Sequence, residues 1–303
     1  MLACPIALYD RIGIYLHPYA ALINHSCDYN SVVGCDGDEL FAKAVRPIKK
    51  GEQILISYVD ASSPYSVRQK ELSKRYFFDC QCSKCSKGTD TPEDRFLTTS
   101  SNGSVLKTAE RKAHSLLESA SGPNSEPAES VRKLESAMQV LHETSAWPVT
   151  RQPYISLRDE LIASLLSAGR FKTAFAHAAI RYTRIDPIVY PYDSHPIRHI
   201  HAWTLAKLAI HLSQGIEQNP DDTIALERFG LNFGLIIWSV LNELVKGEPE
   251  SCTVPRFKRM VKMALFEVHQ EFVANGLEPT NMKDVIDREW EKVGAVVSAT
   301  LGE

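Results

Sequence analysis

Two short stretches, NHSC (Asn24–Cys27) and CQCSKC (Cys80–Cys85), contain four of the seven cysteines of this chain. The second stretch has the spacing Cys-x-Cys-x-x-Cys, which is a strong local signal for metal binding. Three thiolates cannot complete a structural zinc site, because such a site almost always uses four ligands. Cys27 is the best fourth candidate, since soft thiolates suit zinc and four of them form a closed, non-catalytic tetrahedron. The sequence therefore predicts a structural zinc site at Cys80, Cys82 and Cys85, with Cys27 as the favoured fourth ligand.

Histidines offer other ways to complete a metal site. From spacing alone, His25 competes with the cysteine that follows it two positions later. His195 and His199 stand at i and i+4 and offer a metal-binding pair, but helix capping or core hydrogen bonding explains them better. Clustered thiols can also be redox-active. Three isolated cysteines are expected to be small buried hydrophobic side chains: Cys4, Cys35 and Cys252.

The bulk composition is that of an ordinary globular protein. The chain has 303 residues, of which 44% are hydrophobic and 23% charged, and this favours two domains with a sizeable core. The net charge of −3 gives no reason to expect wholesale nucleic-acid binding. No apolar run approaches the ~20 residues of a membrane span. The N-terminal MLACPIALYDRIGIYLHPYA lacks a basic start, so we interpret it as folded protein rather than as a signal peptide.

The first part of the chain, residues 1 to about 60, is predicted to be rich in β-strands. CDGDE (Cys35–Glu39) places Asp-Gly between two apolar runs, which predicts a two-residue hairpin turn. ELFAKAV alternates as a strand does, and QILISY is an apolar run of β-forming residues. Farther along, PYSVRQKELSKRYFF has helical spacing and places Val67, Leu72 and Tyr76 on one side.

Nearly everything after about residue 103 is predicted to be helical, in a series of amphipathic segments. GRFKTAFAHAAIRYTRIDP resembles the second half of a tetratricopeptide repeat (TPR), with Gly169 at the turn and Ala174 and Ala178 allowing close helix approach. Its spacing to Asp186-Pro187 is one residue longer than the usual pattern, and no second copy is clear. The predicted fold class is α+β, with a β-rich part followed by an all-α, TPR-like part.

Three motifs in a fixed order resemble one known family. ALINHSCDYNSVV is followed by ELFAKAVRPIKKGEQILISYVD and then by RQKELSKRYFFDCQCSKC. Over roughly residues 12–88, this order resembles the C-terminal half of a SET domain with its post-SET zinc motif. The helical remainder looks like that of the SET and MYND family of protein-lysine methyltransferases. The resemblance implies the C-terminal part of a SET domain at 1–63, a post-SET zinc-binding segment at 64–90 and a helical TPR-like domain at 91–303.

The resemblance also implies roles for individual residues. In this family the four zinc thiolates come from N-H-S-C and C-x-C-x-x-C, which matches the set predicted above. Asn24 and His25 would contact S-adenosylmethionine, largely through backbone groups. Tyr58 of the ISY motif would be the catalytic tyrosine, Phe78 would stack on the adenine, and Tyr76 would line the lysine channel. Each of these side chains also has a plainer interpretation as part of an ordinary core.

The implied reaction explains why these residue types are needed. A neutral lysine amine displaces sulfur from a sulfonium methyl group in line, so the enzyme mainly aligns and desolvates the reactants, which can supply several kcal/mol. A tyrosine hydroxyl can orient the amine, and aromatic ring faces tolerate the developing methylammonium. Because the cofactor brings the reactive methyl group, the protein supplies orientation and electrostatics.

The chain departs from the family pattern in its first part. No MYND cysteine set and no Gly-x-Gly turn precede N-H-S-C, and Tyr29 replaces the proline usual in this motif. We therefore expect the N-terminal half of the SET domain and the MYND module to be missing. The donor pocket would then lack one wall, and sheet edges and apolar surface would be exposed.

Two hypotheses of different classes follow. The first is an S-adenosylmethionine-dependent protein-lysine N-methyltransferase acting on a histone tail or a non-histone lysine, with activity of this chain alone left open. The second is a non-catalytic interaction scaffold, whose helical part binds a partner peptide. A zinc-containing nucleic-acid regulator is disfavoured, because Asp79 and Asp90 flank Lys84 and Lys87. We expect a monomer in the nucleus or cytoplasm, with S-adenosylmethionine and structural zinc, a protein substrate, no direct nucleic-acid partner and no membrane partner.

Overall fold

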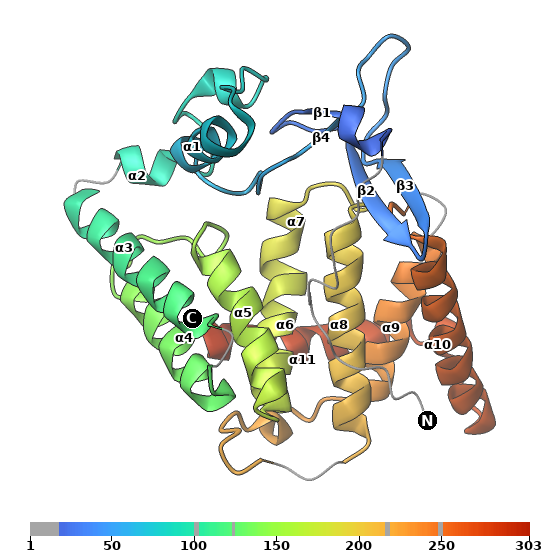
Figure 1. Ribbon diagram of the computed structural model, residues 1–303. Coiled ribbons are helices and arrows are strands. Elements are labelled where there is room, and N and C mark those ends of the chain that lie inside the picture. Colours follow the sequence, from blue (N-terminus) through green and yellow to red (C-terminus); the bar gives the residue numbers. More distant parts are fainter. Residues whose placement is uncertain (1–17, 100–102, 123–124, 216–218, 248–250) are drawn as a thin grey trace. The chain divides into compact units, whose positions relative to one another are not determined.

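The computed structural model (Figure 1) describes residues 18–99, 103–122, 125–215, 219–247 and 251–303. By internal packing the chain divides into unit 1, residues 1–164, and unit 2, residues 165–303. Each unit is described by itself below. Cys4, which was expected to be a buried hydrophobic side chain, lies outside the described residues.

The hairpin predicted at CDGDE is confirmed. Strands β2 (Ser31–Asp36) and β3 (Glu39–Ala44) pair antiparallel, with residues 36 and 39 opposite each other at the turn. Gly37 in the turn has a φ of +62°, a left-handed conformation that costs glycine little. Cys35 is exposed, not buried as expected, because it shares the solvent-facing side of β2 with Val33, whereas Cys252 is buried.

The second pair of strands is shorter than the sequence predicts. Strand β1 (Asn24–His25) runs parallel to β4 (Leu55–Ile56), and the pairing covers only these two residues of each strand. The predicted strand QILISY therefore contributes a single paired step. Because so short a ladder is weak on its own, other contacts must hold it in register.

A buried asparagine supplies those contacts. Asn30 has no solvent exposure, and its Nδ2 donates to the Gln53 carbonyl at 2.8 Å and to Glu52 Oε1 at 3.2 Å. Its Oδ1 accepts a hydrogen bond from the Leu55 N–H at 2.9 Å. One side chain thus satisfies backbone groups on the segment that enters β4, and it fixes that segment beside β1 and β2.

Helix α1 (Tyr65–Tyr76) buries a different face from the predicted one. Leu72 is wholly buried as predicted, but Val67 is 37% exposed and the wholly buried neighbour of Leu72 is Arg68. The helix ends at Phe77, whose φ of +62° turns the chain toward the cysteine segment. An apolar residue such as Val67 is usually the one that is buried on a helix. Here Arg68 is buried instead, because this face of α1 meets polar groups of the site described below.

The remaining elements are helices, as the amphipathic segments predict. The helices that begin in unit 1 are α2 (Arg95–Thr99), α3 (Gly103–Ala120), α4 (Pro127–His142) and α5 (Tyr154–Ser167). Unit 2 contains α6 (Phe171–Ile180), α7 (Asp186–Val189), α8 (Pro196–Ser213), α9 (Phe233–Lys246), α10 (Pro255–Ala274) and α11 (Lys283–Leu301). Helices α3 and α4 pack together in unit 1, and α8 packs against α6 and α9 in unit 2. Within the described residues, no helix combines the length and the apolar character needed to cross a bilayer.

The extra residue of the TPR-like segment is accommodated by a π-helical turn. Gly169 makes the predicted turn with a φ of +71°, and Ala174 and Ala178 are buried on α6, which packs against α8. Residues Arg181–Ile185 then form a π-helical turn, and α7 begins at Asp186. A π turn accommodates one additional residue within a helix, which accounts for the longer spacing to Asp-Pro.

Two histidines at the start of α8 have the plainer roles that the sequence favours. His195 caps the helix, because its Nδ1 accepts a hydrogen bond from the Ile197 N–H at 3.3 Å. His199 places Nε2 at 2.9 Å from the Asp193 carbonyl and Nδ1 at 3.2 Å from Ser251 Oγ. Burial lowers the pKa of His195 to about 4. Helix capping and core hydrogen bonding therefore occupy these rings.

We predict that Asn30→Ala destabilises unit 1 by about 3 kcal/mol, because three hydrogen bonds are lost and buried partners stay unsatisfied. Urea unfolding and amide exchange of the peptide that contains Leu55 measure the effect. Asn24→Ala, at an exposed position of the neighbouring strand, is the matched control and should change stability little. Equal stability of the two variants would contradict the role given to Asn30.

We also predict that unit 2 loses stability in acid through His195. The unfolded chain binds a proton at this side chain below a pKa of about 6.5, whereas the folded chain does so only below about 4. Stability is therefore complete above pH 6.5 and falls by about 3 kcal/mol as the pH drops to 4. His195→Asn keeps a capping acceptor without a titrating group, so its unfolding free energy should depend less on pH. An unchanged slope would refute this source of acid sensitivity.

Candidate functional site

The four cysteines that the sequence singled out come together in unit 1. The sulfur atoms of Cys27, Cys80, Cys82 and Cys85 all lie within 4.8 Å of one another. Cys27 and Cys85 are 58 positions apart in the chain, yet their sulfur atoms are 3.5 Å apart. Cys82 is partly exposed and the other three are buried, with Val59 and Leu72 packed in the same cluster. This group is called the cysteine cluster below.

Helix α1 positions the C-x-C-x-x-C segment through one side chain. Gln69 Nε2 donates to the Cys80 carbonyl at 2.7 Å, and the Cys80 N–H donates to Gln69 Oε1 at 2.9 Å. Farther on, the Ser86 N–H donates to the Cys82 carbonyl at 2.9 Å and closes a tight turn around the thiols. The backbone is therefore folded around the sulfur atoms by local hydrogen bonds.

The cysteine cluster has the donor set and the spacing of a zinc site. With zinc–sulfur bonds of about 2.3 Å, the sulfur atoms of a tetrahedral site lie about 3.8 Å apart. The distances within the cluster, up to 4.8 Å, are close to this value. His25, the alternative ligand, lies beside the cluster with Nε2 at 3.3 Å from Cys27 Sγ. The four thiols supply, without it, the number of ligands that a structural zinc site uses.

Crowding of the thiols creates an electrostatic conflict within the cluster. Hydrogen bonding to the Cys82 sulfur raises the pKa of Cys27, and the same interaction lowers the pKa of Cys82. One thiolate is thus stabilised by neighbours that keep their protons. A divalent cation would relieve this conflict, because it deprotonates coordinating thiols and offsets half of the resulting charge.

Four predicted site residues form a second group beside the cluster. The ring of His25 lies 5.2 Å from that of Tyr58 and 5.8 Å from that of Phe78, centroid to centroid. The rings of Tyr58 and Tyr76 are 4.8 Å apart. Tyr76 and Phe78 are 38% and 37% exposed, so this aromatic group opens to solvent on one side. The structure therefore brings together side chains from β1, from the end of β4 and from the end of α1.

The hydroxyl of Tyr58 is held by the main chain. It donates a hydrogen bond to the Ile23 carbonyl at 2.5 Å. Burial raises the pKa of Tyr58, and the neighbouring Tyr76 raises it further. The group is thus a neutral hydroxyl at physiological pH, with its proton engaged and its oxygen able to accept a further hydrogen bond.

His25 connects the cysteine cluster to the aromatic group. Its Nδ1 accepts a hydrogen bond from the Tyr58 N–H at 3.0 Å, and its Nε2 faces Cys27 Sγ. Burial lowers the pKa of His25, so the ring is neutral and can accept at Nδ1. Asn24, predicted beside it, is exposed, and its place is fixed by the pairing of β1 with β4.

Sequence reasoning missed two residues of this region, Arg68 and Gln69. Arg68 is wholly buried, and its Nη2 lies 3.9 Å from Cys85 Sγ. An arginine four positions before a buried leucine on an amphipathic helix was the available signal. Burial of Arg68 was not predicted, because charged side chains are almost never fully buried unless they are paired.

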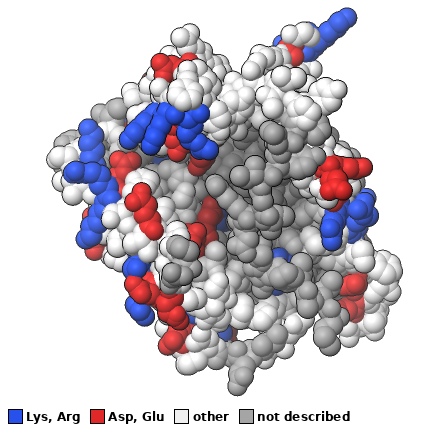
Figure 2. All heavy atoms as spheres, in the orientation of Figure 1, with Lys and Arg blue, Asp and Glu red and all other residues white. Residues whose placement is uncertain are grey.

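Apolar surface is exposed in unit 1, as expected. Large apolar side chains around the strands and the end of α1 remain open to solvent, among them Tyr19, Leu22, Ile54 and Phe77. Phe77 is the extreme case at 88% exposure. Acidic and basic side chains of the described residues are interspersed on the face shown in Figure 2.

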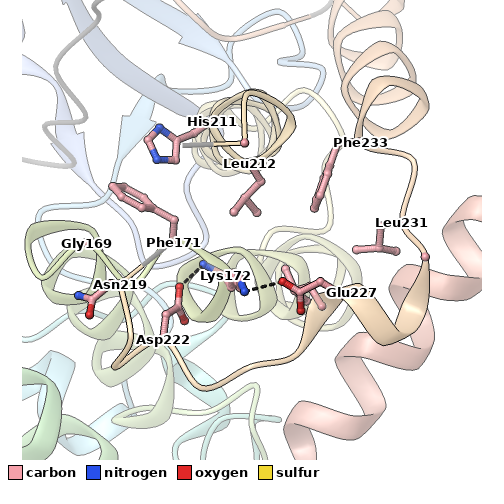
Figure 3. Close-up of a pocket in the computed structure, with 13 residues that line it drawn as sticks. Gly169, Phe171, Lys172, His211, Leu212, Asn219, Asp222, Glu227, Leu231 and Phe233 are labelled. Atoms are coloured by element: carbon pink, nitrogen blue, oxygen red, sulfur yellow. Dashed lines mark hydrogen bonds and ion pairs between the residues drawn. The ribbon is translucent and has the colours of Figure 1, made fainter. Parts of the chain in front are cut away.

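Unit 2 contains a cavity of about 280 Å³ (Figure 3). The rings of Phe171 and His211 are in contact on one side, 3.9 Å between centroids. Lys172 Nζ pairs with Glu227 Oε1 at 2.5 Å, and the Lys172 N–H donates to Asp222 Oδ2 at 2.6 Å. The apolar part of the lining consists of Leu212, Leu226, Leu231 and Phe233. Because these charges are paired, the cavity suits an apolar group better than an ion.

Comparison with protein families matches residues 7–59 to the SET domain. "SET domain and MYND-type zinc finger protein 6" of Schizosaccharomyces pombe is 32% identical over 168 residues, 55% of this chain and 30% of that protein. "Histone-lysine N-methyltransferase SMYD3" of Mus musculus is 26% identical over 207 residues, 67% of this chain and 45% of the relative. "N-lysine methyltransferase SMYD2" of Homo sapiens is 38% identical over 76 residues, 25% of this chain and 18% of the relative.

These matches confirm the resemblance found in the sequence. Residues 7–59 match the SET domain, and over part of their length the relatives similar to this chain are SET and MYND domain proteins. It spans less than half the length of each of these relatives. The predicted fold class is also confirmed, since a short β region with the cysteine cluster is followed by a mostly helical part.

We predict one zinc ion per purified chain and its loss in Cys27→Ser, because three thiolates leave the tetrahedron incomplete. Mass spectrometry of the metal gives the stoichiometry. Cys35→Ser is the matched control, since this exposed thiol lies outside the cluster and its removal should leave the zinc in place. Chelation should also lower the unfolding temperature of the wild type, because metal affinity is part of the folding free energy. Unchanged zinc content in Cys27→Ser would exclude Cys27 as a ligand.

Proposed function

We propose that this chain carries the catalytic elements of an S-adenosylmethionine-dependent protein-lysine N-methyltransferase. The observation that carries the proposal is the aromatic group, in which Tyr58 is in ring contact with Tyr76 and His25. Two of the relatives are named as lysine methyltransferases, which supports the proposal. Histone tails and non-histone proteins are both candidate substrates.

Main-chain pairing holds β1 in a defined path, which supports the cofactor-binding role that we propose for its residues. Asn24 pairs with Leu55 and His25 with Ile56, so their main-chain groups are held by the parallel strands. The Ser26 N–H donates to the Ile56 carbonyl at 3.0 Å and keeps the segment in this path. Asn24 and His25 would contact the cofactor through their backbone, and Phe78, partly exposed beside His25, would stack on the adenine. S-adenosylmethionine supplies the electrophilic methyl group when bound.

Tyr58 would orient the attacking amine. Its hydroxyl donates a hydrogen bond to the Ile23 carbonyl, so the lone pairs of the oxygen can accept a hydrogen bond from a neutral lysine amine. Alignment of this kind is a large part of catalysis in a displacement reaction. Tyr76, 4.8 Å from Tyr58, would form a wall of the lysine channel, and its ring face would stabilise the methylammonium product.

The cysteine cluster would supply a structural zinc site. The cysteine cluster lies close to the proposed catalytic Tyr58. His25 contacts both Cys27 of the cluster and the main chain of Tyr58. A four-thiolate site has no open position for a substrate. Zinc would therefore stabilise the fold of the pocket without taking part in methyl transfer.

A second function is favoured by the cavity of unit 2. Its apolar lining and paired charges suit an apolar side chain from a partner peptide. In this alternative the helical part is an interaction scaffold, and unit 1 is a zinc-stabilised support. The methyltransferase function requires the aromatic group to bind S-adenosylmethionine, whereas the scaffold function does not. Measuring cofactor binding therefore distinguishes the two functions.

Calorimetric titration of S-adenosylmethionine into zinc-loaded protein tests the proposal. We expect micromolar binding in the wild type, weakened about three- to tenfold in Phe78→Ala by the loss of an aromatic contact of about 1 kcal/mol. Tyr58→Phe removes the hydroxyl, so it should weaken binding less and should reduce methyl transfer to a lysine peptide more strongly.

Phe77→Ala is the matched control, because this neighbouring ring is 88% exposed and belongs to no contact of the site. Its affinity should equal that of the wild type. Absence of binding by a folded, zinc-loaded wild type would refute the methyltransferase proposal and favour the scaffold. Circular dichroism establishes that the fold is retained in each sample.

A further inference from the structure

Arg68 presents an electrostatic problem that the predicted site does not explain. Its side chain is among the largest in the chain with no solvent exposure. A buried guanidinium is costly unless an anion or a full set of hydrogen bonds compensates it. In the described part of the chain, the bonds of Arg68 go to the Ser63 carbonyl through Nη1 and to Cys85 Sγ, at 3.9 Å, through Nη2.

The remaining surroundings of Arg68 leave the charge uncompensated. Its Nε is buried without a hydrogen-bond partner among the described residues, and no carboxylate forms an ion pair with it there. Arg181, another buried arginine, pairs instead with the carboxylate of Asp186 at 3.2 Å. Arg68 differs because, among the described residues, its acidic neighbours are the thiols of Cys85 and Cys27 rather than a carboxylate.

The charge of a metal-loaded cysteine cluster resolves the problem. Four thiolates around one zinc ion carry a net charge of about −2. A buried cation in contact with one of these sulfur atoms offsets part of that charge, and an N–H···S bond draws electron density from the thiolate. Burial of Arg68 and assembly of the metal centre therefore favour each other.

We infer that Arg68 is a positioning residue of the metal centre, which stabilises the thiolate of Cys85 and sets how tightly zinc is held. The inference rests on the proposed zinc site. Arg68 also fixes the direction of approach, since Nη1 binds the Ser63 carbonyl in the loop just before α1 while Nη2 reaches the sulfur. The loop, the helix and the cysteine cluster are thus joined through one side chain.

Chelator competition on the full chain measures this role directly. Arg68→Gln should weaken zinc affinity by about 10- to 100-fold, the usual effect of removing a group that supports a metal ligand. Arg68→Lys restores the charge and should recover most of the loss. Lys70→Gln, which removes a positive charge from an exposed position of the same helix, is the matched control and should bind zinc as the wild type does.

Cobalt substitution gives a readout that packing alone would not change. Loss of the N–H···S bond should move the sulfur-to-cobalt charge-transfer band of Arg68→Gln to longer wavelength, and the band of Lys70→Gln should not move. Unchanged zinc affinity in Arg68→Gln would overturn the inference. So would equal losses in Arg68→Gln and Arg68→Lys, because the positive charge would then be irrelevant.

If Arg68→Gln fails to fold, Arg68→Lys is compared with Lys70→Gln. Affinity close to that of the control supports the inference, and a tenfold or greater loss overturns it. A wild type that binds no zinc would remove the proposed zinc site and this inference together. Tight zinc binding by wild type and Arg68→Gln alike would remove the inference and leave the zinc site intact.

Discussion

The approach of four sulfur atoms to within 4.8 Å of one another is the constraint on which unit 1 depends. Two segments must meet for this, one that follows β1 and one that follows α1. Thiolates at such distances repel each other, so a cation bound among them would stabilise the arrangement. Hydrogen bonds from Gln69 and the contact of Arg68 show that the surrounding structure is organised around the same point.

The cysteine cluster and the aromatic group form one structural unit. His25 faces a sulfur atom with one ring nitrogen and the Tyr58 main chain with the other. A shift of Cys27 would therefore be transmitted to the ring whose neighbours define the proposed donor pocket. Asn30 acts from the other side, because it fixes the entry to β4, the strand that precedes Tyr58. The geometry of the aromatic group thus follows from a short motif and one buried amide.

Motif order predicted the site better than periodicity predicted the elements. The spacing of the cysteines predicted the cluster, because a structural zinc ion almost always takes four ligands whatever the fold. The aromatic residues were predicted from the family resemblance. The roles of Asn24, His25, Tyr58, Tyr76 and Phe78 stay predictions, as do the domain boundaries. The buried face of α1 was predicted wrongly at Val67, since apolar spacing cannot reveal an arginine that pairs with sulfur. The short β4 escaped prediction because its pairing depends on Asn30, a tertiary contact.

The excess residue in the TPR-like segment shows the same limit from another direction. Its presence was visible in the spacing to Asp186-Pro187, but the sequence could not say whether a loop or a helical defect would accommodate it. The π turn at Arg181–Ile185 keeps the helix continuous and buries Arg181 against Asp186. A loop would have exposed backbone groups that the turn satisfies internally.

The β2–β3 hairpin lies in the chain between the first cysteine of the cluster and the other three. A protease that cut the turn at Gly37 would sever the polypeptide without separating its pieces, because coordination bonds to a shared ion would tie the fragment with Cys27 to the remainder. Such a nicked molecule would migrate as one particle under native conditions, held by the bound ion and by the pairing of β2 with β3. Metal coordination would thus take over the role of the cut peptide bond in holding the two parts of this region together.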